Sequence, residues 1–330
     1  MIELEERADH YWVTYMYPMR LIKKNDEIVS FSLDEINECS YNHGILCRIV
    51  GDIENSFNGN LVRYIICGDG AVAIDVSSEF SENDLLLNYN DLFCKLMLGG
   101  IDIDCISTRD LTTGNLYGQK SIWPVSFGYS YNSHLHANLR MRITNNVDAI
   151  VLEGASTNAL SIDELKLRLQ GGSEIIDRIN NLSTYHLIVG VTEIKYGNWS
   201  AAVSNLWIVA EQLTDYLWER DFVNNEDRDP DIPTRKQTLR QDHRTFSTSV
   251  KQEILFQIGV LPLDTYSDIY SVRKARNKLI HEGKMASKSD ACKLYRAVNT
   301  LIGKAGKCTQ DTVLPELSRN NRLFRTDVAM

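Results

Sequence analysis

The chain has 330 residues, of which 43% are apolar and 24% are charged, which is the composition of an ordinary globular protein. No apolar run approaches the roughly 20 residues of a membrane-spanning helix, so we do not expect an integral membrane protein. The acidic opening Met1–Arg7 differs from a signal peptide, and we therefore expect a cytoplasmic protein. The seven cysteines form no CxxC pair, and we expect neither a metal site nor a cofactor.

The net charge of −9 argues against a general nucleic-acid binder, but the two halves of the chain differ in charge. Residues 1–180 carry 14 basic and 26 acidic side chains, a net charge of −12, whereas residues 181–330 carry 21 and 18, a net charge of +3. Residues 271–310 alone contain 10 basic and 2 acidic side chains. Such a run is most often a solvated helix face, yet it also supplies the local field that steers a polyanion.

The first half of the chain is predicted to form mainly strands. Short β-branched runs near residues 48–50 and 61–66 indicate strands, and the turn Gly68–Gly70 predicts a hairpin with the run 71–76. Strict alternation over Leu135–Ile143 predicts a further strand with one buried face. Asp84–Leu98 is expected to be a helix across the sheet. We therefore predict an α+β fold with a β-rich N-terminal sensing or regulatory domain over residues 1–160.

After residue 160 the hydrophobic period becomes helical, which predicts an all-α bundle over residues 161–307 and a polar tail over 308–330. Ser161 is expected to cap the first helix and the pair Gly171–Gly172 to end it. Ser173 or Ser183 is expected to cap the next helices. Further helix ends are predicted at four positions: Gly197, 229–233, 259–262 and Gly283.

The predicted helix over residues 198–220 has a second stripe beside its apolar core face. Trp207, Glu211 and Trp218 lie on this second stripe, about 100–140° from the core face of an α-helix. Large aromatic side chains outside the core need a surface to cover them. We expect that surface to be the N-terminal domain or a second copy of the chain.

The predicted helix over residues 264–282 combines an apolar stripe with basic residues. Arg276 lies about 40–60° from the centre of the stripe formed by Ile269, Val272, Ala275 and Leu279, so it must be paired or reach outward to solvent. Arg273, Asn277 and His281 share the adjacent face at i, i+4 and i+8, with Lys274 and Lys278 beside them. An acid–base group, an arginine and lysines are thus within reach of one phosphate.

The string Arg276-Asn277-Lys278-Leu279-Ile280-His281 has the R-x4-H form of the HEPN superfamily of helical ribonuclease domains, which this part of the chain resembles. The upstream segment Tyr196–Ala202, continuing to Ala210-Glu211, looks like the early helix pair of that family. The stretch from Thr238 resembles the middle helix of the Apea-like HEPN branch. The resemblance covers about residues 183–307.

The resemblance implies metal-independent cleavage of RNA, in which the 2′-hydroxyl attacks the adjacent phosphate and leaves a 2′,3′-cyclic phosphate. In such a reaction His281 moves protons and Arg276 stabilises the charged transition state. Asn277 would orient either group, and Lys278 would hold a flanking phosphate, with Arg273 beside them. We expect such a nuclease to be a toxin or anti-phage effector. From the difference in charge between the two halves, we expect its acidic N-terminal domain to restrain it, sense a trigger or bind a regulatory partner.

The spacing of the two central residues predicts a homodimer with a composite site. Arg276 and His281 are five residues apart and point about 140° from each other on an ideal helix, so one helix cannot easily bring both to one phosphate. A two-fold pairing of two copies can, and the resemblance implies such a pair.

A second hypothesis assigns the same residues to structure. In that alternative Arg276 pairs with Glu211 or another acid, His281 caps the helix end, and the chain is a non-catalytic helical interaction or assembly module. Glu211 itself is either the salt-bridge partner of Arg276 or a polar group of the site. Loss of RNA cleavage in Arg276→Ala and His281→Ala separates the two hypotheses.

Overall fold

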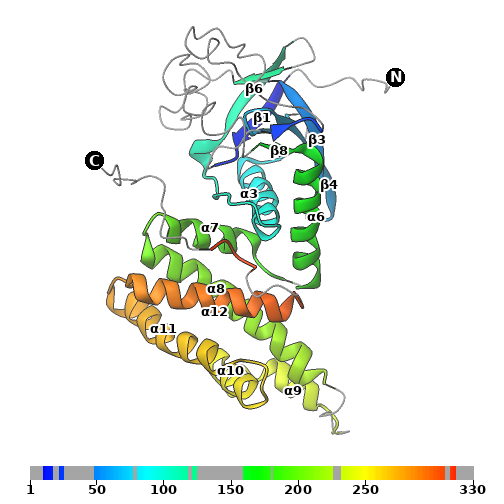
Figure 1. Cartoon of the computed structure of the whole chain (residues 1–330). Helices are drawn as coiled ribbons and strands as arrows, with labels where there is room; N and C mark the ends of the chain where they lie inside the picture. The colour runs from blue at the N-terminus through cyan, green and yellow to red at the C-terminus, as the bar shows by residue number, and fades with distance from the viewer. Residues whose placement is uncertain are drawn as a thin grey trace, which may run out of the picture. The chain divides into compact units, whose positions relative to one another are not determined.

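The computed structural model describes residues 10–17, 22–25, 48–76, 80–117, 121–124, 159–179, 181–225, 232–308 and 313–316. The chain divides into two compact units, residues 1–170 and 171–330. The first contains an antiparallel sheet, and the described part of the second is helical, so the predicted α+β class is confirmed (Figure 1). The predicted strand over residues 135–143 lies outside the described residues.

The sheet of the first unit has six strands in the order β3-β4-β5-β1-β6-β7, and each neighbouring pair is antiparallel. Its strands are β1 (His10–Tyr15), β3 (Ile49–Phe57), β4 (Asn60–Cys67), β5 (Ala71–Asp75), β6 (Thr112–Tyr117) and β7 (Ser121–Pro124). Two short strands, β2 (Ile22–Lys23) and β8 (Leu160–Ser161), form a separate parallel pair.

Two tight turns set the register of β3, β4 and β5. The predicted hairpin between β4 and β5 is confirmed: Gly70 has a φ of 80°, and its N–H donates to the carbonyl of Cys67 at 3.0 Å. Between β3 and β4, Asn58 and Gly59 both have positive φ values, 50° and 81°. An Asn-Gly pair with two positive φ values matches the twist of an antiparallel hairpin.

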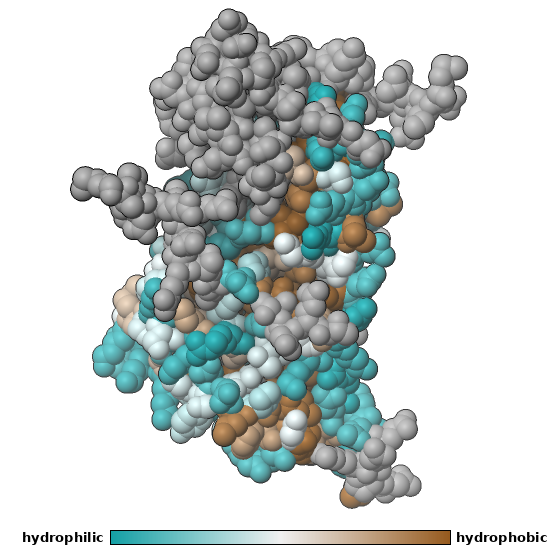
Figure 2. All heavy atoms as spheres, in the orientation of Figure 1, coloured by the Kyte–Doolittle hydropathy of each residue, from teal (hydrophilic) through white to brown (hydrophobic). Residues whose placement is uncertain are grey.

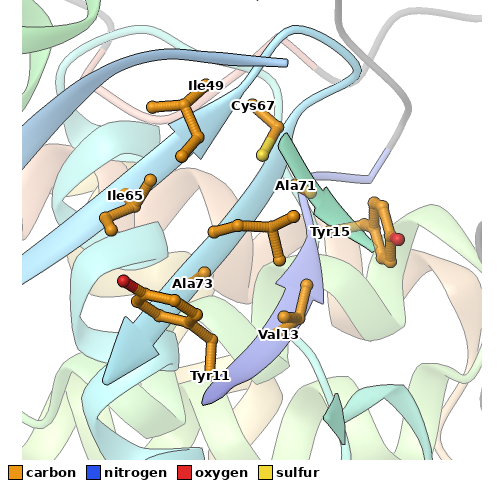
Figure 3. Packing of buried hydrophobic residues seen from close by; sticks show 9 residues of the cluster. Tyr11, Val13, Tyr15, Ile49, Ile65, Cys67, Ala71 and Ala73 are labelled. Carbon is orange, nitrogen blue, oxygen red and sulfur yellow. The ribbon is translucent and has the colours of Figure 1, made fainter. Parts of the chain in front are cut away.

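Alternation along the strands gives the sheet two buried faces. One face carries a cluster that includes Tyr11, Val13, Ile65 and Ala73 (Figure 3). The opposite face presents Tyr64 to helix α3 (Glu82–Leu98), the predicted helix of this half. Full burial of each large apolar side chain of α3 contributes about 1.5–3 kcal/mol to stability.

A buried polar cluster also joins α3 to β3. The Lys95 ammonium donates to Asp91 Oδ2 at 2.7 Å, Asn55 Oδ1 at 2.9 Å and the Ser56 carbonyl at 2.8 Å. Asn55 Nδ2 donates to the same Asp91 oxygen at 2.9 Å. Lys95 therefore uses all three of its N–H donors inside the protein.

The second unit is a bundle of helices. They are α6 (Ile162–Arg178), which begins in the first unit, α7 (Thr184–Lys195), α8 (Trp199–Trp218), α9 (Arg235–Gln241), α10 (Thr248–Gln257), α11 (Leu263–Glu282) and α12 (Lys288–Ala305). A short π-helical turn, Glu219–Val223, extends α8. The predicted ends at Gly197, near residues 259–262 and at Gly283 are all confirmed.

The predicted caps are correct at two helices, and one predicted helix end is wrong. Ser161 Oγ accepts the Glu164 N–H at 3.1 Å, and Ser183 Oγ accepts the His186 N–H at 3.3 Å. Helix α6, however, continues through Gly171–Gly172 to Arg178, because glycine weakens a helix by about 1 kcal/mol without forcing it to end. Ser173 lies inside this helix and caps nothing.

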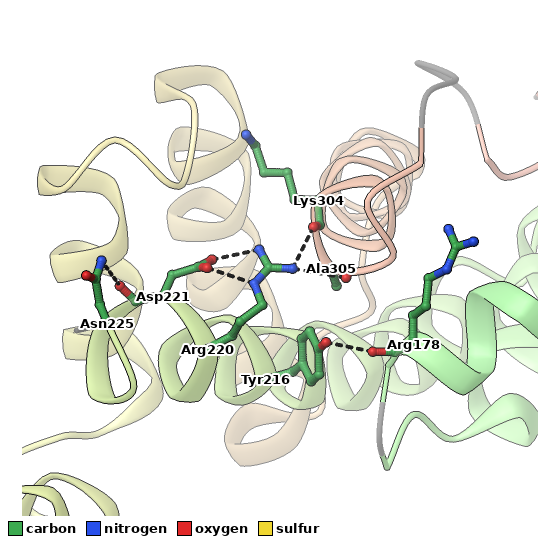
Figure 4. A network of polar contacts seen from close by, with 7 residues as sticks. All are labelled: Arg178, Tyr216, Arg220, Asp221, Asn225, Lys304 and Ala305. Carbon is green, nitrogen blue, oxygen red and sulfur yellow. Dashed lines mark hydrogen bonds and ion pairs between the residues drawn. The ribbon is translucent and has the colours of Figure 1, made fainter. Parts of the chain in front are cut away.

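An arginine holds the end of α12 against the end of α8. Arg220 donates through Nε and Nη2 to both oxygens of Asp221, at 2.7 and 2.8 Å, and its Nη1 donates to the carbonyls of Lys304 and Ala305 at 3.0 Å (Figure 4). The Asp221 carboxylate raises the pKa of Arg220. The guanidinium thus satisfies carbonyls that the end of a helix leaves unpaired.

Part of the predicted polar tail packs on the bundle. Val313 and Leu314 are buried, and both of their N–H groups donate to Asn299 Oδ1 at 2.9 Å.

Among the described residues, no helix combines the length and apolarity that crossing a membrane requires. Figure 2 shows hydrophobic side chains at the lower edge of the bundle, over α10 and the start of α11, where Val250 and Leu263 are exposed.

Candidate active site on helix α11

Five of the six predicted site residues lie on α11, and local sequence explains where this helix begins and ends. Pro262 precedes it with a φ of −66°, and Asp264 lies in its first turn, where a carboxylate interacts favourably with the helix dipole. Gly283 ends it with a φ of 66°, and its N–H donates to the Lys278 carbonyl. A left-handed residue at this position is the usual glycine end of a helix.

The apolar residues of α11 become less buried toward its C-terminal end. Ile269 and Val272 are completely buried where the helix packs on α8, α10 and α12. Ala275 and Leu279, predicted to continue this stripe, are only half-buried, and Ile280 is 55% exposed. The last two turns, which carry the R-x4-H string, therefore project from the bundle core.

Arg276 lies half-buried on this projecting part. Its Nη1 is 3.5 Å from Asn277 Oδ1, the limit of a hydrogen bond, and no carboxylate among the described residues forms an ion pair with it. Its side-chain contact is with the neighbouring amide, and the predicted ion pair with Glu211 or another acid is absent from the described part of the chain. The guanidinium thus remains available to an external anion.

His281 is exposed in the last turn of α11, at the carbonyl end of the helix. Asn277 and Lys278 are also exposed. Lys278 contributes its backbone carbonyl to the turn, accepting the N–H groups of Gly283 and of Lys284. Its side chain forms no ion pair within the described part of the chain.

Arg273 makes a contact that the sequence analysis did not anticipate. Its guanidinium carbon lies 5.0 Å from the centre of the Tyr270 ring, and Lys274 Nζ lies 4.5 Å from the same ring. Tyr270 was not among the predicted site residues. The spacing contained the signal, because Tyr270, Lys274 and Lys278 follow each other at i, i+4 and i+8.

The structure brings the two motif segments of the sequence together. The turn after α11 lies on the N-terminal end of α8: the Ala286 N–H donates to Ser200 Oγ at 2.9 Å, and this hydroxyl donates to Met285 Sδ at 3.6 Å. Lys288 Nζ lies 5.8 Å from the centre of the Trp199 ring. The α7–α8 and α11–α12 turns accordingly lie at one end of the bundle (Figure 1).

Glu211, the sixth predicted residue, is used elsewhere. The Trp207 indole N–H donates to Glu211 Oε1 at 2.7 Å, and Glu211 forms no ion pair with Arg276. Trp207 is only 4% exposed and Trp218 only 2%, and Trp218 packs on Phe222 and Phe246 of its own unit. The sequence analysis expected the N-terminal domain or a second copy to cover these tryptophans. For Trp218 this expectation is wrong, because Phe222 and Phe246 of its own unit pack on it.

The arrangement offers cations and an imidazole on one exposed helix end. Among the described residues, no group of three His, Cys, Asp or Glu side chains is placed to hold a metal ion. The groups on α11 are instead a guanidinium, ammonium groups, an amide and an imidazole, which together suit a phosphate-bearing ligand. Comparison of the chain with protein-family models, with curated proteins and with solved structures finds no match in any of the three.

Proposed function

We propose that this chain is a metal-independent endoribonuclease and that the projecting end of α11 carries its active site. The observation that supports this most directly is the R-x4-H string at an exposed helix end, where Arg276 lacks a carboxylate partner among the described residues. A purely structural arginine at the edge of a bundle would be expected to resemble Arg220, which is held by Asp221 and two carbonyls.

In the proposed reaction, the 2′-hydroxyl of the substrate gives its proton to an imidazole and attacks the adjacent phosphorus. The bond from phosphorus to the 5′-oxygen breaks, and this oxygen takes a proton from a second, protonated imidazole. Arg276 donates to the phosphate oxygens, where negative charge accumulates in the transition state. The substrate is RNA, because DNA lacks the 2′-hydroxyl.

We propose that two copies of the chain form the site together. Arg276 and His281 point about 140° apart on one helix, so a single copy does not bring both to one phosphate. The C-terminal end of α11 suits contact with another copy, because Ile280 is 55% exposed there and Met285, in the turn that follows, is 79% exposed. Two copies would supply one imidazole to take the proton and another to give it.

The decisive experiment measures cleavage of a fluorescent RNA in EDTA by the wild type, His281→Ala and Arg276→Ala. Loss of a general acid–base group is expected to reduce the rate about 10²- to 10⁴-fold. His243→Ala and Arg244→Ala are matched controls, since both residues are exposed in the connection between α9 and α10. A substrate with a single 2′-deoxy sugar should resist cleavage at that linkage only.

Mixing the two inactive variants tests the composite site. If one shared site contains Arg276 and His281 of both copies, dimers of His281→Ala with Arg276→Ala keep one guanidinium and one imidazole, and should be slower than the wild type but faster than either variant alone, which lacks one of the two groups entirely. No activity in any form, together with stable self-association, would instead favour the helical assembly module.

We propose a toxin or anti-phage effector as the biological setting, with the acidic N-terminal unit as its trigger-binding part.

A further inference from the structure

A ladder of aromatic rings leads from α10 to the exposed face of α11. Phe256 stacks on Tyr266 with ring centres 4.9 Å apart and an angle of 11°, and the Tyr266 hydroxyl donates to Glu253. Tyr270 follows one turn later, its ring centre 6.3 Å from that of Tyr266, and it is 42% exposed. The inner rings thus hold Tyr270 in place while its own ring reaches solvent.

Basic side chains continue from the last ring toward His281. Arg273 and Lys274 lie over Tyr270, and Lys278 and His281 follow along the same side of the helix. From Tyr270 to His281 this stripe is about 16 Å long, several times the roughly 3.4 Å rise per nucleotide of a stacked strand. It is long enough for a strand to contact the ring and the imidazole at once.

The carboxylates of α11 lie on its other side. By helical spacing, Asp264, Asp268 and Glu282 fall about 100° or more from Tyr270 around the axis. Asp268 pairs with Arg296 at 3.0 Å, and Glu282 pairs with Lys284 at 2.6 Å. Within the described residues, no carboxylate pairs with Arg273, Lys274 or Lys278, so the stripe has an uncompensated positive charge.

The contact between these cations and the ring can be exchanged for a nucleic-acid base. An exposed cation–π contact contributes about 0.5–1 kcal/mol, whereas stacking of a base on an aromatic side chain contributes about 1–3 kcal/mol. A base that takes the place of one cation over Tyr270 frees this cation for the neighbouring phosphate. Bases inside a duplex are already stacked and cannot do so.

We infer that Tyr270, Arg273, Lys274 and Lys278 hold single-stranded RNA, with an unpaired base stacked on Tyr270 and the strand running toward His281. This inference rests on the proposed function, since it names the substrate conformation for that site. Tyr270 is a substrate-contacting residue in this arrangement, and the lysines set the position of the backbone without reading the sequence.

The test measures RNA binding by fluorescence anisotropy in full-length His281→Ala, so that cleavage does not interfere. The probes are an unstructured labelled single strand and a perfect duplex of equal length. We expect tighter binding of the single strand. Tyr270→Ala should weaken it about 5- to 150-fold, whereas Tyr270→Phe, which keeps the ring, should stay within about twofold. Lys274→Ala should reduce the slope of log affinity against log salt by about 1.

The control is Arg244→Ala, which removes an exposed cation outside the stripe and should leave the preference for single strands unchanged. Equal binding of duplex and single strand, or unchanged binding by both Tyr270→Ala and Lys274→Ala, would overturn the inference. Cleavage by the wild type is measured in parallel. Cleavage without these binding effects refutes the stripe alone, whereas the binding effects without cleavage refute the proposed nuclease and leave the stripe standing.

Discussion

The ammonium of Lys95, in the sheet-bearing unit, is buried with three oxygen acceptors, whereas Lys274 and Lys278 on α11 extend into solvent and form no ion pair with a described residue. A buried charge without partners is expensive, so Lys95 and Asp91 must stay together for their unit to stay folded. The cations of α11 have no such constraint. Their arrangement therefore carries little information about folding and more about what binds there.

Replacing Lys95 should have the largest effect on stability. Lys95→Met removes the ammonium that pairs with the buried Asp91 carboxylate, and we expect local stability to fall by about 3–5 kcal/mol. Hydrogen exchange of peptides from residues 82–98 measures this loss in the intact protein. Adding Asp91→Asn should restore part of it, because the buried negative charge is then removed together with the positive one.

A surface ion pair of the same unit provides the matched control. Arg63 Nε lies 2.8 Å from Asp52 Oδ2, and both side chains are more than 40% exposed. Arg63→Met should change stability by less than about 1 kcal/mol. If Lys95→Met were as mild as Arg63→Met, the contrast between the buried cluster of Lys95 and the exposed cations of α11 would lose its basis.

The next largest effect should come from packing in the helical unit. A Cβ atom added at Gly190 of α7 would lie 2.6 Å from Leu206 Cγ and 3.2 Å from the Leu206 backbone nitrogen of α8. Gly190→Ala must push the two helices apart, and we expect a cost of about 1–3 kcal/mol despite the better helix propensity of alanine. Thermal unfolding followed by circular dichroism checks this.

At Gly171 the same change, glycine to alanine, should have the opposite effect on stability. It lies inside α6, and an added Cβ atom would meet nothing within 4 Å. Gly171→Ala should therefore stabilise the protein by up to about 1 kcal/mol, through helix propensity alone. Destabilisation by Gly171→Ala would mean that α6 does end near this glycine, as the sequence suggested.

The features that sequence predicted well are local ones. Gly283, Gly197 and Ser183 mark helix boundaries because a cap is made by a residue and its nearest neighbours in the chain. The position of Arg276 and His281 near the end of one helix followed from the same local spacing. Gly171–Gly172 shows the limit, since tertiary context decides whether a glycine pair ends a helix.

The features that sequence missed depend on residues that are distant in the chain. Trp218 is covered by Phe246, and Ser200 accepts the N–H of Ala286, which no periodicity reveals. Leu279 is only half-buried although its spacing places it on the same stripe as the buried Ile269 and Val272. Tyr270 is different: its spacing to Lys274 was visible, but only the geometry shows that both cations lie over its ring.

The smallest expected effect concerns a surface ion pair of the helical unit. Arg240 Nε donates to both oxygens of Glu219, at 2.9 and 3.1 Å, and Asn224 Nδ2 donates to Oε1 at 2.9 Å. The hydrogen bond from Arg240 lowers the pKa of Glu219 below its ordinary value of 4.5, the hydrogen bond from Asn224 lowers it further, and partial burial opposes both. A carboxylate with a depressed pKa stabilises the fold above its unfolded pKa, and this stabilisation is lost as the pH falls through the folded pKa.

Comparison of the wild type with Glu219→Gln at several pH values isolates this contribution. Because the pair is largely exposed, the difference in unfolding free energy at pH 7 should be less than about 1 kcal/mol. It should shrink toward zero as the pH falls below 4.5, since the wild-type side chain then becomes neutral as well. Glu174→Gln, whose partner Arg178 lies 3.5 Å away, is the control and should show a smaller difference. A large, pH-independent loss of unfolding free energy in Glu219→Gln would mean that an exposed charge of the helical unit is structural. Exposure alone would then no longer distinguish the cations of α11 from structural charges.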